Sequence, residues 1–482
     1  MKNNSIEHDT YKSVMNNDDT ICALATAAAT SAIAVIRVSG PKSFDVVSSL
    51  FKRKNCDLNI EDIRPNRLYY GEIVVDSEVV DDVFVSFFKS PHSYTGEDSA
   101  EISCHGSSYI RSCILEALIS KGIRFAEAGE YTKRAFLNGK LDLAQAEAVA
   151  DLISSENRAA HRLAMNQMRG GFSDELRSLR SQLVEMTSLL ELELDFSEED
   201  VEFANRDELL ALTDSATERV TTLAKSFRLG NAIKNGIPVA IVGEPNTGKS
   251  TLLNTLLNDD RAIVSEIAGT TRDTIEETMT IDGILFRFID TAGIRKTTET
   301  IEKIGIERSL RKMMEADIVL GVLDITDDYE AILNAVELIV SRTDVMRQNV
   351  ILLLNKSDMI PAVSEDLEKS LRKMLDARIS LFPISARNGD GVQFLKESLV
   401  SSRIGKQFEN DTVLVSNMRH FEALRCAGES LKAVHDGLVG GISSDFIAQD
   451  LRHALYHLGS ITGEVTSEEI LGNIFGRFCI GK

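Results

Sequence analysis

The sequence predicts a multidomain chain in which an α+β domain precedes an all-α domain, and the all-α domain is interrupted by an inserted α/β domain. Three observations predict this. Alternating or β-branched runs occupy 20–130, apolar residues then recur at helical spacing, and over 236–400 short apolar strands alternate with helical stretches. The 482 residues also suit three or four domains, at roughly 100–200 residues each.

The N-terminal tail, 1–18, is polar and has no apolar stretch, so we expect it to be disordered and not a targeting signal. The first domain should then cover 19–135. It should contain four strands bounded by turn-forming residues, at 32–40, 68–75, 79–88 and 99–106.

Helical periodicity marks two segments, 136–235 and 401–482. In the first segment the apolar residues recur every three or four positions, at Leu176, Leu179, Leu183, Met186, Leu190 and Leu194. Since the two segments flank 236–400, the simplest topology inserts that α/β domain into one helical domain.

The charge balance is acidic, with 53 Lys and Arg against 74 Asp and Glu and a net charge of −21. This argues against a general polyanion-binding protein, because neutralising phosphates needs clustered cations. It still allows nucleic acid to be contacted at one local patch. The longest apolar runs, such as 318–323, are far shorter than the roughly 20 residues of a membrane span, so no membrane partner is expected.

The six cysteines are scattered and form no C-x-x-C pair, which indicates reduced thiols in a cytoplasmic protein. Cys104 and His105 are adjacent on an expected strand. Adjacent strand residues point to opposite faces, so a structural placement is favoured over a nucleophile–base pair.

Gly243-Glu-Pro-Asn-Thr-Gly-Lys-Ser250 matches the phosphate-binding pattern G-x-x-x-x-G-K-[ST], between a strand pattern and a helix pattern. Backbone N–H groups of such a loop cradle phosphates. Lys249 would reach the β and γ oxygens and assist catalysis, and Ser250 would ligate Mg²⁺. The alternative is a glycine-rich turn before an ordinary helix.

Two motifs that follow point to the γ-phosphate and its metal. Gly269-Thr-Thr-Arg272 would bring Thr271 to Mg²⁺. Asp290-Thr-Ala-Gly293 ends a strand pattern and would bring Asp290 near the metal and the Gly293 N–H near the γ-phosphate.

A later motif, with the short segment Ser385-Ala386 after it, points to the base. In Asn355-Lys-Ser-Asp358 the Asp358 carboxylate can accept from guanine N1–H and N2–H₂, a donor pair that adenine lacks, and Ser385-Ala386 completes the pocket. Four ordered motifs predict a GTPase with GTP as substrate. The predicted nucleotide-binding residues are Asn246, Thr247, Gly248, Lys249, Ser250, Thr251, Ser265, Glu266, Ile267, Ala268, Gly269, Thr270, Thr271, Asp290, Thr291, Ala292, Gly293, Asn355, Lys356, Asp358, Ser385, Ala386 and Arg387.

Ile294 follows the Asp290–Gly293 motif, where Ras-like enzymes carry the Gln that orients the attacking water. An apolar side chain cannot orient water. Either hydrolysis is negligible or another group replaces the Gln, with Glu299, Glu302 and Glu307 as candidates; solvated helix-face charges are the alternative for each.

These motifs resemble one family closely, the tRNA-modification GTPase MnmE (TrmE) family. The resemblance runs from about residue 19 to 482. It rests on the nucleotide motifs and on the segments 34–40, 93–106, 129–153, 300–309 and 461–482, the last ending in Phe-Cys-Ile-Gly-Lys.

The resemblance implies a fold: an N-terminal folate-binding and dimerisation domain (19–135), a helical domain (136–235 and 401–482), and an inserted Ras-like P-loop G domain (236–400). It also implies a function. With a flavin-containing partner, MnmG (GidA), such proteins build an aminomethyl or carboxymethylaminomethyl group on C5 of the wobble uridine in certain tRNAs. The carbon comes from 5-formyl- or methylene-tetrahydrofolate. The implied assembly is a homodimer within a heterotetramer or larger complex.

The resemblance also assigns roles. Asn246, with Ser265, Ile267 and Thr270, would hold a K⁺ that stimulates hydrolysis when two G domains meet face to face. Glu302 would orient the water. The folate-site matches are Arg37, Glu101, Lys140 and Lys482.

Three interpretations of Cys479 stay open. By resemblance it takes part in the modification chemistry, and the alternatives are an inert thiol or a lipidated cysteine. Gly481 and Lys482 disfavour lipidation. The segment 23–32 departs from the family, since it lacks the usual Gly and Pro residues. A GTPase switch that recruits a ribosome-assembly or other partner is the alternative function. The acidic charge predicts that the chain alone binds tRNA weakly.

Overall fold

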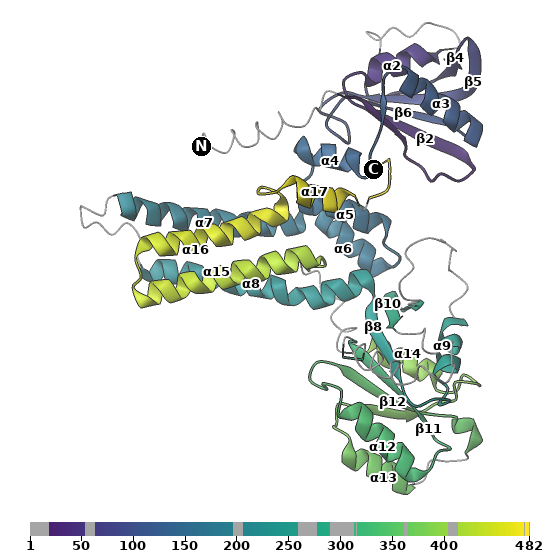
Figure 1. Cartoon of the computed structure of the whole chain (residues 1–482), viewed down its shortest axis with the longest axis vertical. Coiled ribbons are helices and arrows are strands. Elements are labelled where there is room, and N and C mark those ends of the chain that lie inside the picture. The colour runs from purple at the N-terminus through teal and green to yellow at the C-terminus, as the bar shows by residue number, and fades with distance from the viewer. Residues whose placement is uncertain are drawn as a thin grey trace. The chain divides into compact units, whose positions relative to one another are not determined.

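The structure is a computed structural model that describes residues 19–53, 63–195, 206–258, 277–289, 313–314, 316–360, 365–402, 413–476 and 478–481. It divides into two compact units (Figure 1). One contains the described residues up to Ala150, with Gln167–Ser181 and the chain from Leu455 on. The other contains Asp151–Asn166 and Gln182–Ala454.

The first unit is built on a seven-stranded sheet of order β3-β4-β5-β6-β2-β1-β7. Neighbouring strands are antiparallel except β1 and β7, which are parallel. The strands are β1 (Ile21–Leu24), β2 (Ser31–Ser39), β3 (Phe51–Lys52), β4 (Leu68–Val75), β5 (Glu78–Phe88), β6 (Ser99–Gly106) and β7 (Arg124–Phe125). The four predicted strands are confirmed within a residue at each end, and the short β1, β3 and β7 were not predicted.

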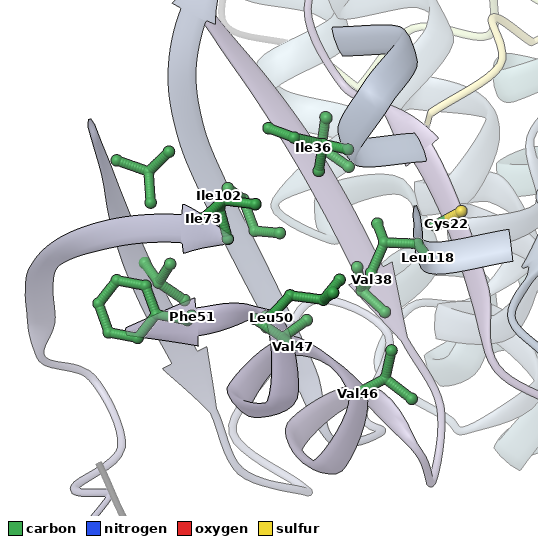
Figure 2. Close-up of a cluster of buried hydrophobic side chains, with 14 of the residues drawn as sticks. Cys22, Ile36, Val38, Val46, Val47, Leu50, Phe51, Ile73, Ile102 and Leu118 are labelled. Carbon is green, nitrogen blue, oxygen red and sulfur yellow. The ribbon is translucent and has the colours of Figure 1, made fainter. Parts of the chain in front are cut away.

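One face of this sheet carries the core of the unit, shown in Figure 2. Alternate residues such as Ile36 and Val38 of β2 and Ile102 of β6 point to this face and are fully buried. Helices α2 (Ser43–Leu50) and α3 (Ser108–Ser120) cover it. The opposite face carries polar side chains, such as Arg37 and Glu101, together with the exposed aromatic pair Tyr70 and Phe84.

Helices α4 (Glu130–Leu137) and α17 (Glu468–Phe475) meet in the first unit. The other helices before the α/β region are α5 (Leu143–Ile153), α6 (Arg158–Met168), α7 (Gly171–Asp195) and α8 (Arg206–Asn235), and those after it are α15 (Met418–Gly440) and α16 (Ser444–Thr462). The apolar residues that were predicted to share one face of α7 are buried from Leu176 to Leu190. None of the described helices combines the length and apolarity that crossing a membrane requires.

The second unit contains a six-stranded sheet of order β13-β12-β11-β8-β10-β9, parallel except for the β9–β10 pair. Its strands are β8 (Ile237–Val242), β9 (Glu277–Ile281), β10 (Ile284–Ile289), β11 (Ile318–Asp324), β12 (Asn349–Asn355) and β13 (Ser380–Pro383). Strand β9 pairs antiparallel with β10 at one edge of this sheet.

Both faces of the second sheet are covered, as the continuous apolar runs predict. Leu320 and Val322 face a cluster that includes α9 (Lys249–Asn258) and α14 (Val392–Val400). Val319 and Leu323 face the opposite cluster, with α12 (Tyr329–Val340) and α13 (Glu365–Met374) (Figure 1). This is the predicted doubly wound α/β architecture.

Candidate functional site

The phosphate-binding loop joins the end of β8 to the start of α9, as the sequence predicts. Two of its glycines are required by close contacts. A Cβ on Gly243, which has a φ of 152°, would lie 2.2 Å from the Val322 carbonyl oxygen, and one on Gly248, with a φ of 94°, would lie 2.1 Å from Asn355 Nδ2. The left-handed region favours glycine at both positions, and the neighbours leave no room for a side chain.

Polar side chains inside the loop hold its shape. Thr247 is buried and donates from Oγ1 to the Glu244 carbonyl over 3.0 Å. Lys249 donates to the Gly243 carbonyl over 2.9 Å and also to that of Glu244. Burial lowers the pKa of Lys249, an effect that the charge of Glu244 opposes. Phosphate oxygens would restore favourable charge around this ammonium group. Ser250, the next residue of α9, offers the hard oxygen ligand that Mg²⁺ takes.

Asn355, the last residue of β12, connects the phosphate loop to the base loop. Its Nδ2 donates to the Thr247 carbonyl over 2.7 Å, and its Oδ1 accepts from the Ala386 N–H over 2.9 Å. Thr255 of α9 donates to the Ala386 carbonyl over 2.7 Å. The two predicted loops are therefore held against each other by buried hydrogen bonds.

Asp358 is exposed, and Ser385 Oγ donates to its Oδ1 over 2.7 Å. Ser385 itself is fully buried and accepts from the Asn388 N–H. The Asp358 carboxylate is thus oriented by one hydroxyl at the surface, as a side chain that recognises a base must be.

Lys356 lies between these elements with a φ of 66° and forms an ion pair with Asp324 at the end of β11. Burial alone would raise the pKa of Asp324, but hydrogen bonds from Lys356 and Thr326 outweigh it and lower that pKa. The ends of β8, β11 and β12 therefore meet at one site, where parallel sheets bind ligands.

Comparisons with known proteins agree with this geometry. Residues 143–479 match the model of the MnmE helical domain, and 20–140 match that of the GTP-binding protein TrmE N-terminus. The chain is 50% identical over 467 residues to the tRNA modification GTPase MnmE of Bacteroides thetaiotaomicron, covering 97% of this chain and 100% of the relative. The same protein from Porphyromonas gingivalis is 51% identical over 469 residues, covering 97% and 98%.

The chain belongs to the tRNA modification GTPase MnmE family.

As a member of the MnmE family it is a GTPase that uses GTP with Mg²⁺, as predicted from its motifs. Among solved structures, Aquifex aeolicus Era bound to GDP·AlF₄⁻ is 27% identical, with a TM-score of 0.28, and covers 40% of this chain and 66% of that one.

Several predicted MnmE-type residues lie outside the described part of the chain: the run 265–271, the run 290–293, Glu302 and Lys482. Ile294, Glu299 and Glu307 lie outside it too. Their assignments remain predictions.

A second cluster lies on the face of the first unit's sheet opposite its hydrophobic core. Arg37 of β2 and Glu101 of β6 are register partners, and the Arg37 guanidinium lies 2.8 Å from Glu101 Oε1. The guanidinium carbon also lies 5.3 Å from the ring centre of Tyr94 and 5.6 Å from that of Tyr131. Tyr131 donates from its hydroxyl to the Arg37 carbonyl over 2.7 Å. The two predicted folate residues are therefore brought together, with the Arg37 guanidinium over two aromatic rings.

Lys140 contacts the loop 90–98, which also carries Tyr94 of this cluster. Its Nζ donates to the Pro91 carbonyl over 3.0 Å, and its stem packs on Gly96. The same loop carries Tyr94, whose hydroxyl lies 2.9 Å from Thr132 Oγ1 on α4. Tyr94 and Tyr131 were not predicted as site residues, although both occur in segments on which the family resemblance rests.

The described part of the C-terminal tail also lies on this unit. The Gly129 N–H donates to the Cys479 carbonyl over 3.4 Å, and Ile480 bridges to Ala128. A Cβ on Gly481 would lie 2.2 Å from the Leu24 carbonyl. Cys479 is exposed. Because Gly129 is the N-cap of α4, the tail is tied to the helix that carries Tyr131.

Proposed function

We propose that this chain is the GTP-hydrolysing subunit of a tRNA modification complex. With the flavin-containing partner MnmG it would install an aminomethyl or carboxymethylaminomethyl group on C5 of the wobble uridine in certain tRNAs. The observation that carries the proposal is the similarity, at half of all positions, to curated tRNA modification GTPases over their whole length. We also propose the domain limits 19–135, 136–235 with 401–482, and 236–400.

In GTP hydrolysis, loop N–H groups and Lys249 bind the β and γ phosphates, and Ser250 with Thr271 holds Mg²⁺, which supplies positive charge to the phosphate oxygens. Asn246 has a left-handed φ of 64° inside this loop. By its match to the family motif, Asn246 would hold a K⁺ together with Ser265, Ile267 and Thr270. Glu302 would orient the attacking water.

Hydrolysis rates in K⁺ and Na⁺ test the cation assignment. We expect much faster turnover in K⁺, because the water-orienting Gln is missing and a cation must supply charge. Equal rates in the two salts would contradict the assignment. Glu302→Ala should bind GTP normally and hydrolyse it poorly, while Glu337→Ala, at an exposed glutamate of α12, serves as the matched control.

Arg37, Glu101, Lys140 and Lys482 would bind a tetrahydrofolate derivative. In support, Arg37 pairs with Glu101 and lies over the rings of Tyr94 and Tyr131, and the exposed Lys140 suits an anionic tail. The tail residue Cys479 would act beside this site in the modification chemistry.

Calorimetry with 5-formyltetrahydrofolate tests the folate site. Arg37→Gln should weaken binding at least tenfold, because it removes the charge that pairs with Glu101 and stacks on the rings. The control is Lys52→Gln, an exposed lysine of β3 in the same sheet. Equal losses in both variants would move the folate site elsewhere.

Mass spectrometry of tRNA nucleosides from a deletion strain tests the function as a whole. The proposal expects the wobble-uridine modification to disappear. Unchanged wobble uridines would favour a switch that recruits another partner without modification chemistry. The chain is proposed to act as a homodimer and to bind tRNA weakly by itself. Its partner would supply much of the tRNA-binding surface.

A further inference from the structure

A cavity of about 480 Å³ lies where α8 and the start of α15 meet the G-domain sheet. It is at the edge where the parallel strands begin: Pro238 is at the start of β8, Asp317 precedes β11, and Arg347 lies two residues before β12. The phosphate and base loops follow the opposite ends of these strands. The cavity is therefore distinct from the GTP site.

Its lining is cationic in a chain whose net charge is −21. Four cations, Lys225, Arg228, Arg287 and Arg347, and one carboxylate, that of Asp317, line it. The cations that line the cavity therefore outnumber its one carboxylate. Such a concentration in an acidic protein attracts anions.

The Asp317 carboxylate pairs with one of these cations, Arg228. Arg228 donates from Nε to Asp317 Oδ1 over 2.8 Å, and it also donates to the Arg347 carbonyl over 2.7 Å. Lys225 and Arg347 have exposed side chains, and within the described part of the chain neither forms an ion pair. Their charges are available to a ligand.

An aromatic pair completes the lining. Phe227 of α8 and Phe421 of α15 stack with ring centres 4.8 Å apart and planes inclined by 23°. Pro238 and Ile289 add apolar surface from the sheet. A cavity of this volume, apolar on some walls and charged on others, has the size and composition of small-molecule sites.

We propose that this cavity binds a small organic anion, a planar ring that carries a phosphate or carboxylate group. The ring would lie against the aromatic and apolar wall, and the anionic group would contact Lys225 and Arg347. None of the lining residues belongs to the nucleotide or folate sets, so the inference stands or falls independently of the proposed function.

The test uses the full chain saturated with GDP and Mg²⁺, and 1-naphthyl phosphate as the probe. The chain has no tryptophan, so the naphthyl fluorescence can be followed by anisotropy with little protein background. We expect saturable binding by the wild type. Arg347→Glu and Lys225→Glu should each weaken it at least tenfold, and uncharged 1-naphthol should bind at least tenfold less tightly.

The matched control is Arg342→Glu, an exposed arginine of the same domain that does not line the cavity. It should bind the probe like the wild type, and all three variants should melt at the wild-type temperature. No saturable binding by the wild type, equal affinities in all variants, or equal binding of 1-naphthol would overturn the proposal.

Discussion

Asn355 and Thr247 are joined by a 2.7 Å hydrogen bond between a side-chain amide and a loop carbonyl. The same amide accepts from the Ala386 N–H, and Asn355 is only 2% exposed. Only a side chain with a donor and an acceptor at one end can make both bonds. One residue of the base motif therefore also positions the phosphate loop.

Asn355→Asp removes the donor and sets a carboxylate against the Thr247 carbonyl. We expect a loss of about 2 kcal/mol, or roughly thirtyfold in GDP affinity. The measurement is the dissociation constant of a fluorescent GDP analogue. Asn349→Asp, at the other end of β12, is the control and should stay within twofold of the wild type. Similar losses in both variants would mean that the link does not position the loop.

Gly248→Ala should abolish nucleotide binding, because its Cβ would meet Asn355 Nδ2 at 2.1 Å. Gly283→Ala isolates the cost of backbone strain, since Gly283 has a φ of 80° and nothing within 4 Å of its added Cβ. That control should cost about 1 kcal/mol of unfolding free energy and leave GDP affinity unchanged. Normal GDP binding by Gly248→Ala would contradict the close approach of Asn355 to Gly248.

Asp358→Asn should exchange the base preference from guanine to xanthine. The carboxylate accepts from two guanine donors, whereas an amide can donate to the xanthine carbonyl and still accept from N1–H. We expect GTP to bind at least tenfold more weakly and XTP at least tenfold more tightly, measured by competition against labelled nucleotide. Asp366→Asn, an exposed aspartate of α13, should change neither affinity.

Glu130→Gln probes a buried charge network in the first unit. Burial alone would raise the pKa of Glu130, but hydrogen bonds from Arg124, the Glu127 N–H and Arg134 hold it below its ordinary value of 4.5. The contacts to Arg124 and Arg134 are 2.6 and 2.9 Å. Leaving these arginines without their carboxylate should lower the unfolding free energy by about 3 kcal/mol at pH 7.

The sign of the pH dependence follows from the lowered pKa. The ionised Glu130 stabilises the fold above its unfolded pKa, and that stabilisation is lost as pH falls through the folded pKa. The difference between wild type and Glu130→Gln should therefore be constant above about pH 5 and narrow below it. Thermal unfolding from pH 7 to 3.5 measures it. Exposed Glu127→Gln is the control, and a difference that widens in acid would contradict the assignment.

Local patterns predicted much of the fold and the nucleotide motifs. Alternation along β2, β4, β5 and β6 and the apolar runs of β8, β11 and β12 are short-range signals, so their strands were predictable. The face argument for Cys104 and His105 is also confirmed. Cys104 is buried, with its pKa raised by burial to about 11, whereas His105 is exposed and pairs with Asp81.

What the sequence could not predict depends on contacts between distant residues. The strand β1 is four residues long and is defined by its pairing with β2 and β7. The Asn355–Thr247 bond joins residues 108 positions apart, and the Tyr131–Arg37 bond joins residues 94 apart. Spacing along the chain carries no signal for such contacts. Only the family resemblance predicted that Arg37 and Glu101 belong to one site.

The most direct measurement is nucleoside mass spectrometry of tRNA from a deletion strain that carries either the wild-type gene or the Asp358→Asn variant. The wild type should restore the C5 modification of the wobble uridine. The variant should not restore it at equal protein levels, because the guanine pocket must bind GTP for the modification to proceed. Full modification with the variant, or none lost on deletion, would contradict a role of this GTP site in tRNA modification.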